Sequence, residues 1–544
     1  MSEKDVHRGT EAGRGLAGTD YAILISIIIG TIFLYYPKLS LFFLSDDFLF
    51  LEKFGDFGGI VTGAANYHFN PVTQTLFYAM IKLFGLAPAP YHAVTLLLHL
   101  ANTALLFIMS RKLFDNRWTA ALSAVLFVTF FSHYEVLYWV TGVYYLLLTL
   151  FYLLTLIVFA RYLEEGGRLC YILFLLLFGG AIFSMEQGVT LIAPCILYEL
   201  FVHDGGWVAA GRFKEGLSSN IKCVKKYIPP LLLMVLFFVI KFSLHQAVVI
   251  QEDGSLLSTL SVFLRMMWML LLSYVDIFVA VINFSYLADI ESPLFYKILG
   301  LTMMTLNKYY IYYLLLITLL GILMYCSGAR RNLYLMGAIL AYMTPVALSA
   351  NEQARYFYLP SIFTAMLLAN ILVSFVAREI GSGRGLRIRI FFVALLVIAV
   401  TSHIPLNVFT LRDAYKEWER ASLITRNIIR DTGELGKEDK AENIYFVNLP
   451  DALYKKKETW PEAYIRAYIF RNGIGSAMRL FHPDSGISQV IPVRTASTGG
   501  IVTWKGHRLI HPSELAGLVD NESNLVLRYD EKLQTVKRMG KRGQ

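Results

Sequence analysis

The chain has 544 residues, of which 56% are hydrophobic, 14% aromatic and only 16% charged. A water-soluble protein of this size could not bury so much apolar surface, so the composition excludes an ordinary soluble globular protein. The formal net charge is +9, but the excess lysine and arginine lies mostly in short segments between apolar runs, so this charge gives little support to nucleic-acid binding.

Apolar runs that are long enough to cross the hydrocarbon core of a bilayer recur between residues 21 and 409. They predict an α-helical polytopic membrane protein with about 11–13 transmembrane helices. The first run is long and no small-residue cleavage site follows it, so we expect a membrane span rather than a signal peptide. The predicted spans are 21–43, 91–110, 118–134, 140–160, 169–185, 187–203, 227–245, 309–327, 332–349, 358–377 and 390–409.

Lysine and arginine are distributed unevenly between the loops. Segments on the side of the N-terminus contain 19 of these residues, whereas segments on the other side contain 5. Because positive residues stay in the cytoplasm, the arm 1–20 is predicted to be cytoplasmic and the loop 44–90 exterior. The segment 259–284 is a re-entrant or interfacial helix, or part of a further hairpin; a complete hairpin would not change this orientation. The expected location is the bacterial inner membrane, with the endoplasmic reticulum as the alternative.

Two exterior regions are expected. The first is the loop 44–90 of the membrane domain, which spans 21–410; its segments 47–60 and 72–85 are expected to be interfacial helices. Residues 411–544 are of a suitable size for a small exterior α/β domain. Its predicted elements are a helix over 412–433, a strand over 443–449, a helix near 462–480, and strands at 488–493, 500–504 and 524–529. This domain is either a lid or acceptor-docking domain, or a cap that adds stability.

Ionisable and polar residues collect at the predicted exterior ends of separate spans. Asp46 and Asp47 are adjacent carboxylates with apolar residues on both sides. The other members of this group are His68, Asn70, His133, Glu135, Glu186 and Arg355. Each could simply mark a helix end in water, but charged groups at a membrane edge are costly and are usually functional. The pattern therefore indicates a site on the exterior face.

Transfer of a sugar from a polyprenyl-phosphate carrier would use such a site. The reaction needs a base that accepts the proton of the acceptor hydroxyl, and an aspartate at the water boundary is suitable. It also needs a fixed cation for the departing phosphate, and the planar guanidinium of Arg355 can pair with two phosphate oxygens. We therefore expect the acidic pair and Arg355 to face one exterior vestibule.

Several motifs occur in order between about residue 40 and residue 370. They are the acidic pair, 70-NPVTQTLFYAMIKLFGLAPAPYHAVTLLLHLANTALL-106, 133-HYEVLYWVTG-142, 184-SMEQGVTLIAPCILYEL-200 and 355-RYFYLPS-361. With these motifs the chain resembles the GT-C class of glycosyltransferases and, within it, the protein O-mannosyltransferase-like branch. The closest resemblance is to the membrane half of the transmembrane-and-tetratricopeptide O-mannosyltransferases and to their bacterial relatives.

The resemblance implies an inverting transferase that uses a polyprenyl- or dolichyl-phosphate sugar, with the first exterior acid, Asp46, as the base. It also implies that Arg355 anchors the phosphate and that Glu135 and Glu186 line the pocket. The chain departs from the family pattern at Asn70, Val143 and Met185, where relatives commonly have cations. These departures leave Arg355 as the sole expected anchor. The C-terminal region has no 34-residue helical repeat, so the acceptor of the repeat-bearing relatives is not carried over.

Other candidate residues have both a functional and a structural interpretation. His68 and His133 could contact phosphate or sugar, or serve only in packing. His99 is expected to be a hydrogen-bonded core residue, and Lys38 to extend toward water from its span. Trp139, Tyr144, Tyr145, Tyr356 and Tyr358 could stack on a sugar or isoprenoid, or form the aromatic belt of a membrane interface.

No obligatory metal ion is expected, because the adjacent Asp-Asp pair lacks the Asp-x-Asp spacing of metal-using oligosaccharide transferases, although a divalent metal is possible. The expected partners are the lipid bilayer, a polyprenyl-phosphate-linked sugar and an acceptor protein or glycolipid. One alternative function is a flippase or transporter of lipid-linked sugars, which would need repeats and charges at mid-bilayer. The other alternative is a non-catalytic membrane scaffold.

Overall fold

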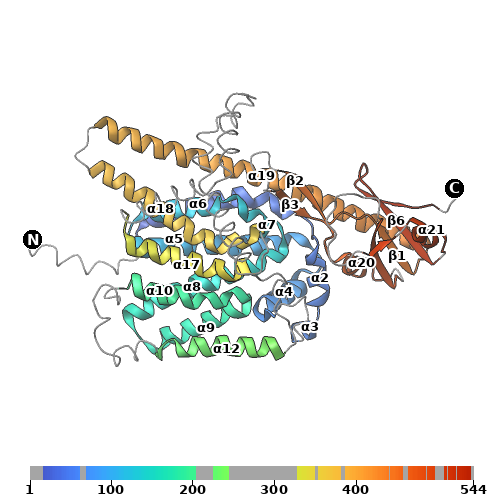
Figure 1. Cartoon of the computed structure of the whole chain (residues 1–544), viewed down its shortest axis with the longest axis horizontal. Helices are drawn as coiled ribbons and strands as arrows, with labels where there is room; N and C mark the ends of the chain where they lie inside the picture. Colours follow the sequence, from blue (N-terminus) through green and yellow to red (C-terminus); the bar gives the residue numbers. More distant parts are fainter. Residues whose placement is uncertain are drawn as a thin grey trace, which may run out of the picture. The chain divides into compact units, whose positions relative to one another are not determined.

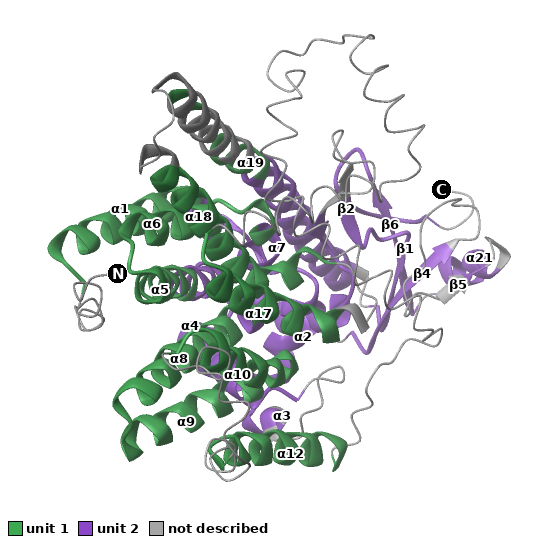
Figure 2. Ribbon diagram, turned by 60° about the vertical axis from the view of Figure 1, so that its left-hand side comes forward, with its two compact units in different colours: residues 1–34, 98–133, 145–410 green, residues 35–97, 134–144, 411–544 purple. Residues whose placement is uncertain are grey.

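The computed structural model (Figure 1) describes residues 16–61, 69–203, 225–243, 327–348, 353–381, 386–439, 441–456, 464–484, 487–495, 508–510, 512–521 and 523–540. The chain forms two compact units (Figure 2). Unit 1 comprises Met1–Leu34, Leu98–His133 and Tyr145–Thr410, and unit 2 comprises Tyr35–Leu97, Tyr134–Tyr144 and Leu411–Gln544.

Unit 1 is helical throughout its described residues. Its elements are α1 (Gly18–Tyr35), the later part of α5 (Pro88–Phe114), α6 (Arg117–Val128), η3 (Phe131–His133), most of α8 (Val143–Glu165), α9 (Arg168–Ser184), η5 (Glu186–Leu191), α10 (Ile192–Phe201), α12 (Ile228–Ser243), α17 (Ala329–Leu348), η7 (Ala354–Phe357), α18 (Tyr358–Gly381) and the first part of α19 (Leu386–Asp439). α18 packs against α6 and α17, α17 packs against α10, and α9 packs against α12. Apolar side chains fill these contacts, so the helices are stabilised by packing as well as by their own hydrogen bonds.

The expectation of a helical, multi-pass membrane protein is confirmed. The predicted spans in the described part of the chain are helical, but 118–134 is broken between α6 and η3 and 187–203 between η5 and α10. The segment 259–284 and all of 309–327 except its last residue lie outside the described residues. Four described helical segments are long and apolar enough to cross a bilayer: Gly18–Ser40, Pro88–Phe114, Val140–Glu165 and Ala354–Arg378. The pair Arg117–Val128 and Phe131–Tyr138, bent by 52°, would be a fifth. The total of about 11–13 spans stays a prediction.

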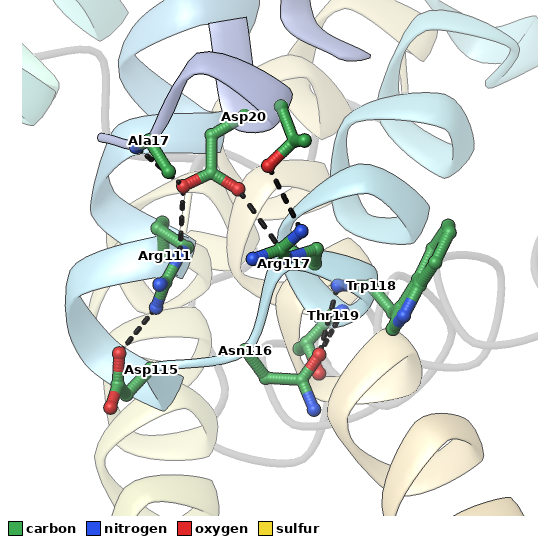
Figure 3. A network of polar contacts seen from close by, with 9 residues as sticks. Ala17, Asp20, Arg111, Asp115, Asn116, Arg117, Trp118 and Thr119 are labelled. Atoms are coloured by element: carbon green, nitrogen blue, oxygen red, sulfur yellow. Dashed lines mark hydrogen bonds and ion pairs between the residues drawn. The ribbon is translucent and has the colours of Figure 1, made fainter. Parts of the chain in front are cut away.

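A buried carboxylate joins the N-terminal end of α1 to the turn between α5 and α6 (Figure 3). Asp20 has no exposed surface, and its Oδ2 accepts a hydrogen bond from Arg111 Nε at 3.4 Å. Arg117 Nε lies 3.8 Å from the other oxygen of Asp20. The turn itself is fixed by Asn116, whose side chain caps α6 by accepting hydrogen bonds from the backbone N–H groups of Trp118 and Thr119.

Unit 2 contains short helices in the loop 44–90, just before it and in the segment 134–142. They are η2 (Tyr36–Ser40), α2 (Asp46–Lys53), α3 (Phe57–Val61), α4 (Pro71–Phe84), α7 (Tyr134–Tyr138) and η4 (Val140–Gly142). The helices expected over 47–60 and 72–85 are therefore present as α2, α3 and α4, while their position at a membrane interface stays a prediction. A Cβ on Gly142 would lie 2.1 Å from the carbonyl oxygen of Val136, so glycine lets η4 fold back onto α7.

The C-terminal part of unit 2 contains a five-stranded sheet of order β5-β4-β1-β6-β7. Its strands are β1 (Asn443–Val447), β4 (Gln489–Thr495), β5 (Arg508–Ile510), β6 (Asn524–Asp530) and β7 (Thr535–Arg538). All neighbours are parallel except β6 and β7. α21 (Pro512–Asp520) places Leu515 and Leu518 against a core of Val447, Val493, Ile510 and Val526. The small α/β region expected from the sequence is confirmed.

The helix predicted near 462–480 is wrong in its first half. Tyr464–Tyr468 forms strand β3, which pairs antiparallel with β2 (Ala452–Lys456), and the helix α20 is limited to Ile474–Phe481. Alternation of Ile465 and Ala467 with polar neighbours fits a strand, and Gly473 at φ +84° separates the strand from the helix. The helix predicted over 412–433 is part of α19, and the strand predicted at 500–504 lies outside the described residues.

Replacing Asp20 with Asn should lower the stability of unit 1, because Arg111 and Arg117 would lose a buried counter-charge. The cost is expected to be about 1–3 kcal/mol, since hydrogen bonds to charged groups are worth that much and both arginines are partly exposed. Thermal unfolding of the purified protein in detergent measures this loss. Asp115→Asn is the matched control, because Asp115 pairs with the same Arg111 but is 77% exposed. Equal effects of the two variants would contradict the assigned role of Asp20.

Candidate functional site

The acidic pair follows a turn in which one residue has an unusual backbone conformation. Ser45 has φ 50° and ψ −114°, which is strained for a residue with a side chain, and Asp46 begins α2 directly after it. The Ser45 N–H donates to the carbonyl oxygen of Ile469 at 2.9 Å. The backbone N–H of Asn472 donates to Ser45 Oγ at 3.4 Å. The turn is therefore held by residues of the C-terminal part of unit 2.

Asp47 is buried and accepts hydrogen bonds on both carboxylate oxygens. Its Oδ1 accepts from the backbone N–H of Thr141 at 2.9 Å and from Thr141 Oγ1 at 2.7 Å, and its Oδ2 accepts from the N–H of Leu44 at 2.9 Å. Burial nevertheless raises the pKa of Asp47 to about 7, against the opposing effect of these hydrogen bonds. The side chain is 1% exposed and ties α2 to η4.

Asp46 is placed differently from its neighbour. It is only partly buried, and its Oδ1 accepts a hydrogen bond from Asn472 Nδ2 at 2.7 Å. Within the described part of the chain, its Oδ2 has no hydrogen-bond donor. Of the two adjacent acids, Asp46 is therefore the one with a carboxylate oxygen left for another molecule.

Glu135 is also in unit 2 and is 3% exposed. Its Oε1 accepts a hydrogen bond from Tyr468 Oη at 2.8 Å, across 333 residues of sequence. The ring of Tyr468 lies 4.8 Å from that of Trp139, and Trp139 Nε1 donates to the carbonyl oxygen of Leu44 at 3.1 Å. Glu135 and Trp139 thus belong to the same connected cluster as the acidic turn. The motif that begins at residue 133 reaches this cluster through both of them.

Three further candidates of unit 2 have different environments. Asn70 is 1% exposed and precedes α4, and its Oδ1 has no hydrogen-bond partner among the described residues. His68 lies outside the described residues. Lys38 does not extend to the surface as expected: it is fully buried and its Nζ donates to Thr95 Oγ1 at 2.6 Å. Lys38 belongs to η2, and its partner Thr95 belongs to α5.

Arg355 belongs to unit 1, where η7 positions it. Its Nε donates to Tyr145 Oη at 3.2 Å, and its guanidinium carbon lies 5.4 Å from the centre of the Tyr356 ring. Tyr145 and Tyr356 are themselves in edge contact, with ring centres 5.9 Å apart. Arg355 is partly exposed as a residue, and two aromatic side chains contact its guanidinium. The expectation that Arg355 and Asp46 face one vestibule stays a prediction.

Tyr358 and His133 form part of a packed core in unit 1. Tyr358 Oη lies 2.7 Å from His99 Nδ1, and His133 Nε2 lies 2.9 Å from Ser361 Oγ. The rings of His133 and Tyr358 are 4.7 Å apart, and Tyr358 and both histidines have no exposed surface. This arrangement agrees with the structural interpretation of His99. A substrate contact by His133 or Tyr358 stays a prediction.

Glu186 has a partner that was not recognised in the sequence. Lys241 Nζ of α12 donates to Glu186 Oε1 at 2.6 Å, and Lys241 is 8% exposed. The sequence suggested that this region lacks a cation because Met185 precedes Glu186. The cation is instead provided by a helix 55 residues later, a distance over which no local motif connects the two residues.

Asn472, Thr141 and Tyr468 were also missed as neighbours of the candidate acids. Thr141 lies within the quoted motif 133–142 and could have been found there as a potential hydrogen-bond donor. Nothing in the local sequence marks the other two, which come from the C-terminal region. No group of three or more His, Cys, Asp or Glu residues among those described is arranged to hold a metal ion.

No protein-family model matches the chain. Among curated proteins, it is similar to the protein O-mannosyl-transferase TMTC1 of Mus musculus, with 29% identity over 154 residues, which are 26% of this chain and 16% of that protein. It is also similar to TMTC3 of Homo sapiens, with 28% identity over 174 residues, which are 30% of this chain and 19% of that protein. The chain thus matches less than a fifth of the length of these relatives. Over this part, the predicted resemblance is confirmed.

Two solved structures show a more distant similarity. ArnT from Cupriavidus metallidurans in the apo state has a TM-score of 0.44 and 11% identity, covering 95% of this chain and 94% of that chain. The archaeal oligosaccharyltransferase AglB from Archaeoglobus fulgidus, solved with an inhibitory peptide and a dolichol-phosphate, has a TM-score of 0.42 and 13% identity. It covers 79% of this chain and 62% of that one.

The raised pKa of Asp47 predicts a specific dependence of stability on pH. The folded protein keeps a proton on Asp47 that the unfolded chain releases near the ordinary aspartate pKa of about 3.9. The stability contributed by this proton is fully present below about pH 4 and is lost as the pH rises through about 7. Compared with Asp47→Asn, the free energy of unfolding of the wild type should fall by up to about 1.4 kcal/mol per pH unit in this window. Melting temperatures of both proteins in detergent over this pH range measure the effect. A difference between the two proteins that does not change with pH would refute the prediction.

Proposed function

We propose that the chain is a membrane glycosyltransferase that transfers a sugar from a polyprenyl-phosphate donor to an acceptor hydroxyl on the exterior face of the membrane. The similarity to protein O-mannosyl-transferases supports a transferase and makes mannose the first sugar to test. In this proposal the arm 1–20 is cytoplasmic, 21–410 is the membrane domain and 411–544 lies outside the membrane. The membrane is the bacterial inner membrane.

Asp46 is the general base in this proposal, and the observation that carries the assignment is the contrast between the two acids. Both oxygens of Asp47 accept hydrogen bonds from Thr141 and Leu44, and the side chain is buried. Asp46 is partly exposed and has one oxygen without a donor in the described part of the chain. A base must reach the proton that it removes, and this favours Asp46.

The reaction proceeds by direct displacement at the anomeric carbon. The acceptor oxygen attacks that carbon, and its proton moves to Oδ2 of Asp46. The bond between the anomeric carbon and the phosphate oxygen breaks, and its electron pair leaves with the polyprenyl phosphate. Attack opposite to the leaving group inverts the configuration. The mechanism requires no metal ion, because the phosphate is already a good leaving group.

Arg355 stabilises the departing phosphate in this proposal. Its guanidinium is positioned by Tyr145 and Tyr356, and the planar fork of an arginine can pair with two phosphate oxygens. Glu135 and Glu186 then have supporting roles, because each already accepts a hydrogen bond from a neighbouring side chain, Tyr468 or Lys241.

The direct test compares glycans and glycolipids by mass spectrometry in cells with and without the gene. A class of sugar-modified protein or lipid that disappears with the gene and returns with the wild-type chain identifies the acceptor. If the chain were a flippase, cells without the gene would lose every product that depends on the exported sugar donor. If it were a non-catalytic scaffold, Asp46 variants would restore these cells as well as the wild-type chain does.

Asp46→Asn should reduce turnover by at least about 100-fold, because an amide cannot accept the proton in the transition state. Turnover is measured with purified protein, a polyprenyl-phosphate sugar and the acceptor found in cells. Asp56→Asn is the matched control, since Asp56 is an exposed acid of the same loop. Normal turnover of Asp46→Asn would rule out Asp46 as the base.

Arg355→Ala should raise the donor KM by about 10- to 100-fold, since a charge-assisted, bidentate contact to phosphate is lost. Arg355→Lys should be intermediate, because lysine keeps the charge but not the fork. Arg161→Ala provides the control for removing an exposed arginine from another helix of the same unit. An unchanged donor KM in Arg355→Ala would exclude Arg355 as the phosphate anchor.

A further inference from the structure

The acidic turn is enclosed by a short segment of the C-terminal region, residues 469–473, which we call the clamp segment. Its Ile469 carbonyl accepts the Ser45 N–H at 2.9 Å, and Asn472 donates to Ser45 Oγ from its backbone and to Asp46 Oδ1 from its side chain. The Asn472–Asp46 bond joins residues that are 426 positions apart. A segment that only covered the loop would not need to bond both the backbone and the side chains of the turn.

Gly473 makes this close approach possible. It has φ +84°, and a Cβ added to it would lie 2.5 Å from the carbonyl oxygen of Ser45. Ser45 in turn holds the strained backbone conformation that precedes α2. Strain of this kind persists only where the surroundings determine it, and here the surroundings are the clamp segment. The direction in which Asp46 points is therefore set partly by residues 469–473.

The contacts on either side of the clamp segment keep it in place. Phe470 stacks on Phe48 of α2 with ring centres 5.8 Å apart. Arg479 of α20 forms an ion pair with Glu52 of α2, and its guanidinium holds the pKa of Glu52 below its usual range. The Ile469 N–H donates to the carbonyl oxygen of Asp451 at 2.9 Å, so the clamp is also tied to the start of β2.

We propose that Asn472 is a positioning residue for the general base, and this inference rests on the function proposed above. Its side-chain amide donates a hydrogen bond to Oδ1 of Asp46. This bond fixes the orientation of the carboxylate so that Oδ2 is directed toward the acceptor hydroxyl. An amide is suited to this role because it donates to the carboxylate without adding a charge that would neutralise it. The C-terminal region then forms part of the active site rather than only a cover for it.

A merely structural role of Asn472 gives a different outcome from a positioning role. If the bond served stability alone, its loss would lower the melting temperature and leave the chemistry of the folded protein unchanged. If it positions the base, its loss lowers kcat and also changes the pH at which the base becomes protonated, because a carboxylate that loses a donated hydrogen bond holds its proton more tightly. The neighbouring ionisable groups are Asp47 on α2, the Glu52–Arg479 pair, Glu135 beside Tyr468, and Arg471 over the Tyr468 ring.

The experiment compares Asn472→Ala and Asn472→Asp with wild type in the full-length chain. We expect Asn472→Ala to lower kcat by about 10- to 100-fold, leave the donor KM within about twofold, and move the acidic limb of the kcat/KM profile to higher pH. Asn472→Asp should move that limb further, because it places a third carboxylate beside Asp46 and Asp47. Asn521→Ala, at an exposed turn of the same region, is the control.

Melting temperatures show whether each variant is folded, and Gly473→Ala provides a second approach. This change leaves the Asn472 side chain intact but forces the clamp away from Ser45, so it should also lower kcat with little change in donor KM. An Asn472→Ala variant with wild-type kcat and pH profile would overturn the inference. If Asp46→Asn is inactive in the same assay, Asp46 remains the base and only the role of Asn472 fails; if Asp46→Asn is active, Asp46 is not the base. Absence of sugar transfer by the wild type would overturn the proposed function itself.

Discussion

Two adjacent carboxylates with apolar residues on both sides impose the main constraint on this structure. Burying one ionised carboxylate is costly, and its neighbour adds a like charge. The chain separates their environments: Asp47 enters the protein and accepts hydrogen bonds from Thr141 and Leu44, while Asp46 remains partly exposed. Because consecutive residues of a helix face different directions, the first turn of α2 is enough to produce this separation. Two adjacent acids thus have different environments, one buried and one partly exposed.

Much of the membrane domain could be predicted from the sequence, because hydrocarbon permits few alternatives to a helix. Apolar runs such as 140–160 and 358–377 have no other way to satisfy their backbone, and both are helical. The acidic pair could also be recognised, since charges beside apolar runs are conspicuous. The secondary structure of the C-terminal region was harder to predict. Tyr464–Tyr468 is a strand because β2 pairs with it, although its sequence alone also fits a helix.

The partners of the candidate residues were the least predictable part of the site. Asn472, Tyr468 and Lys241 meet Asp46, Glu135 and Glu186 only after folding, and they lie 426, 333 and 55 residues away in the sequence. A motif describes residues that are close along the chain, so it cannot report such contacts. For example, the motif around Met185 suggested that no cation lies beside Glu186. Lys241 supplies the positive charge from α12.

The missing Cβ of Gly473 has a consequence for engineering this protein. The first loop and the clamp segment fit each other so closely that neither could be exchanged alone for its counterpart from a homologue. A chimaera that imports a foreign tail would bring a new side chain or a shifted backbone against the Ser45 carbonyl and would release the turn. The first loop and the C-terminal region of a chimaera would therefore have to come from the same protein, although they lie far apart in the sequence.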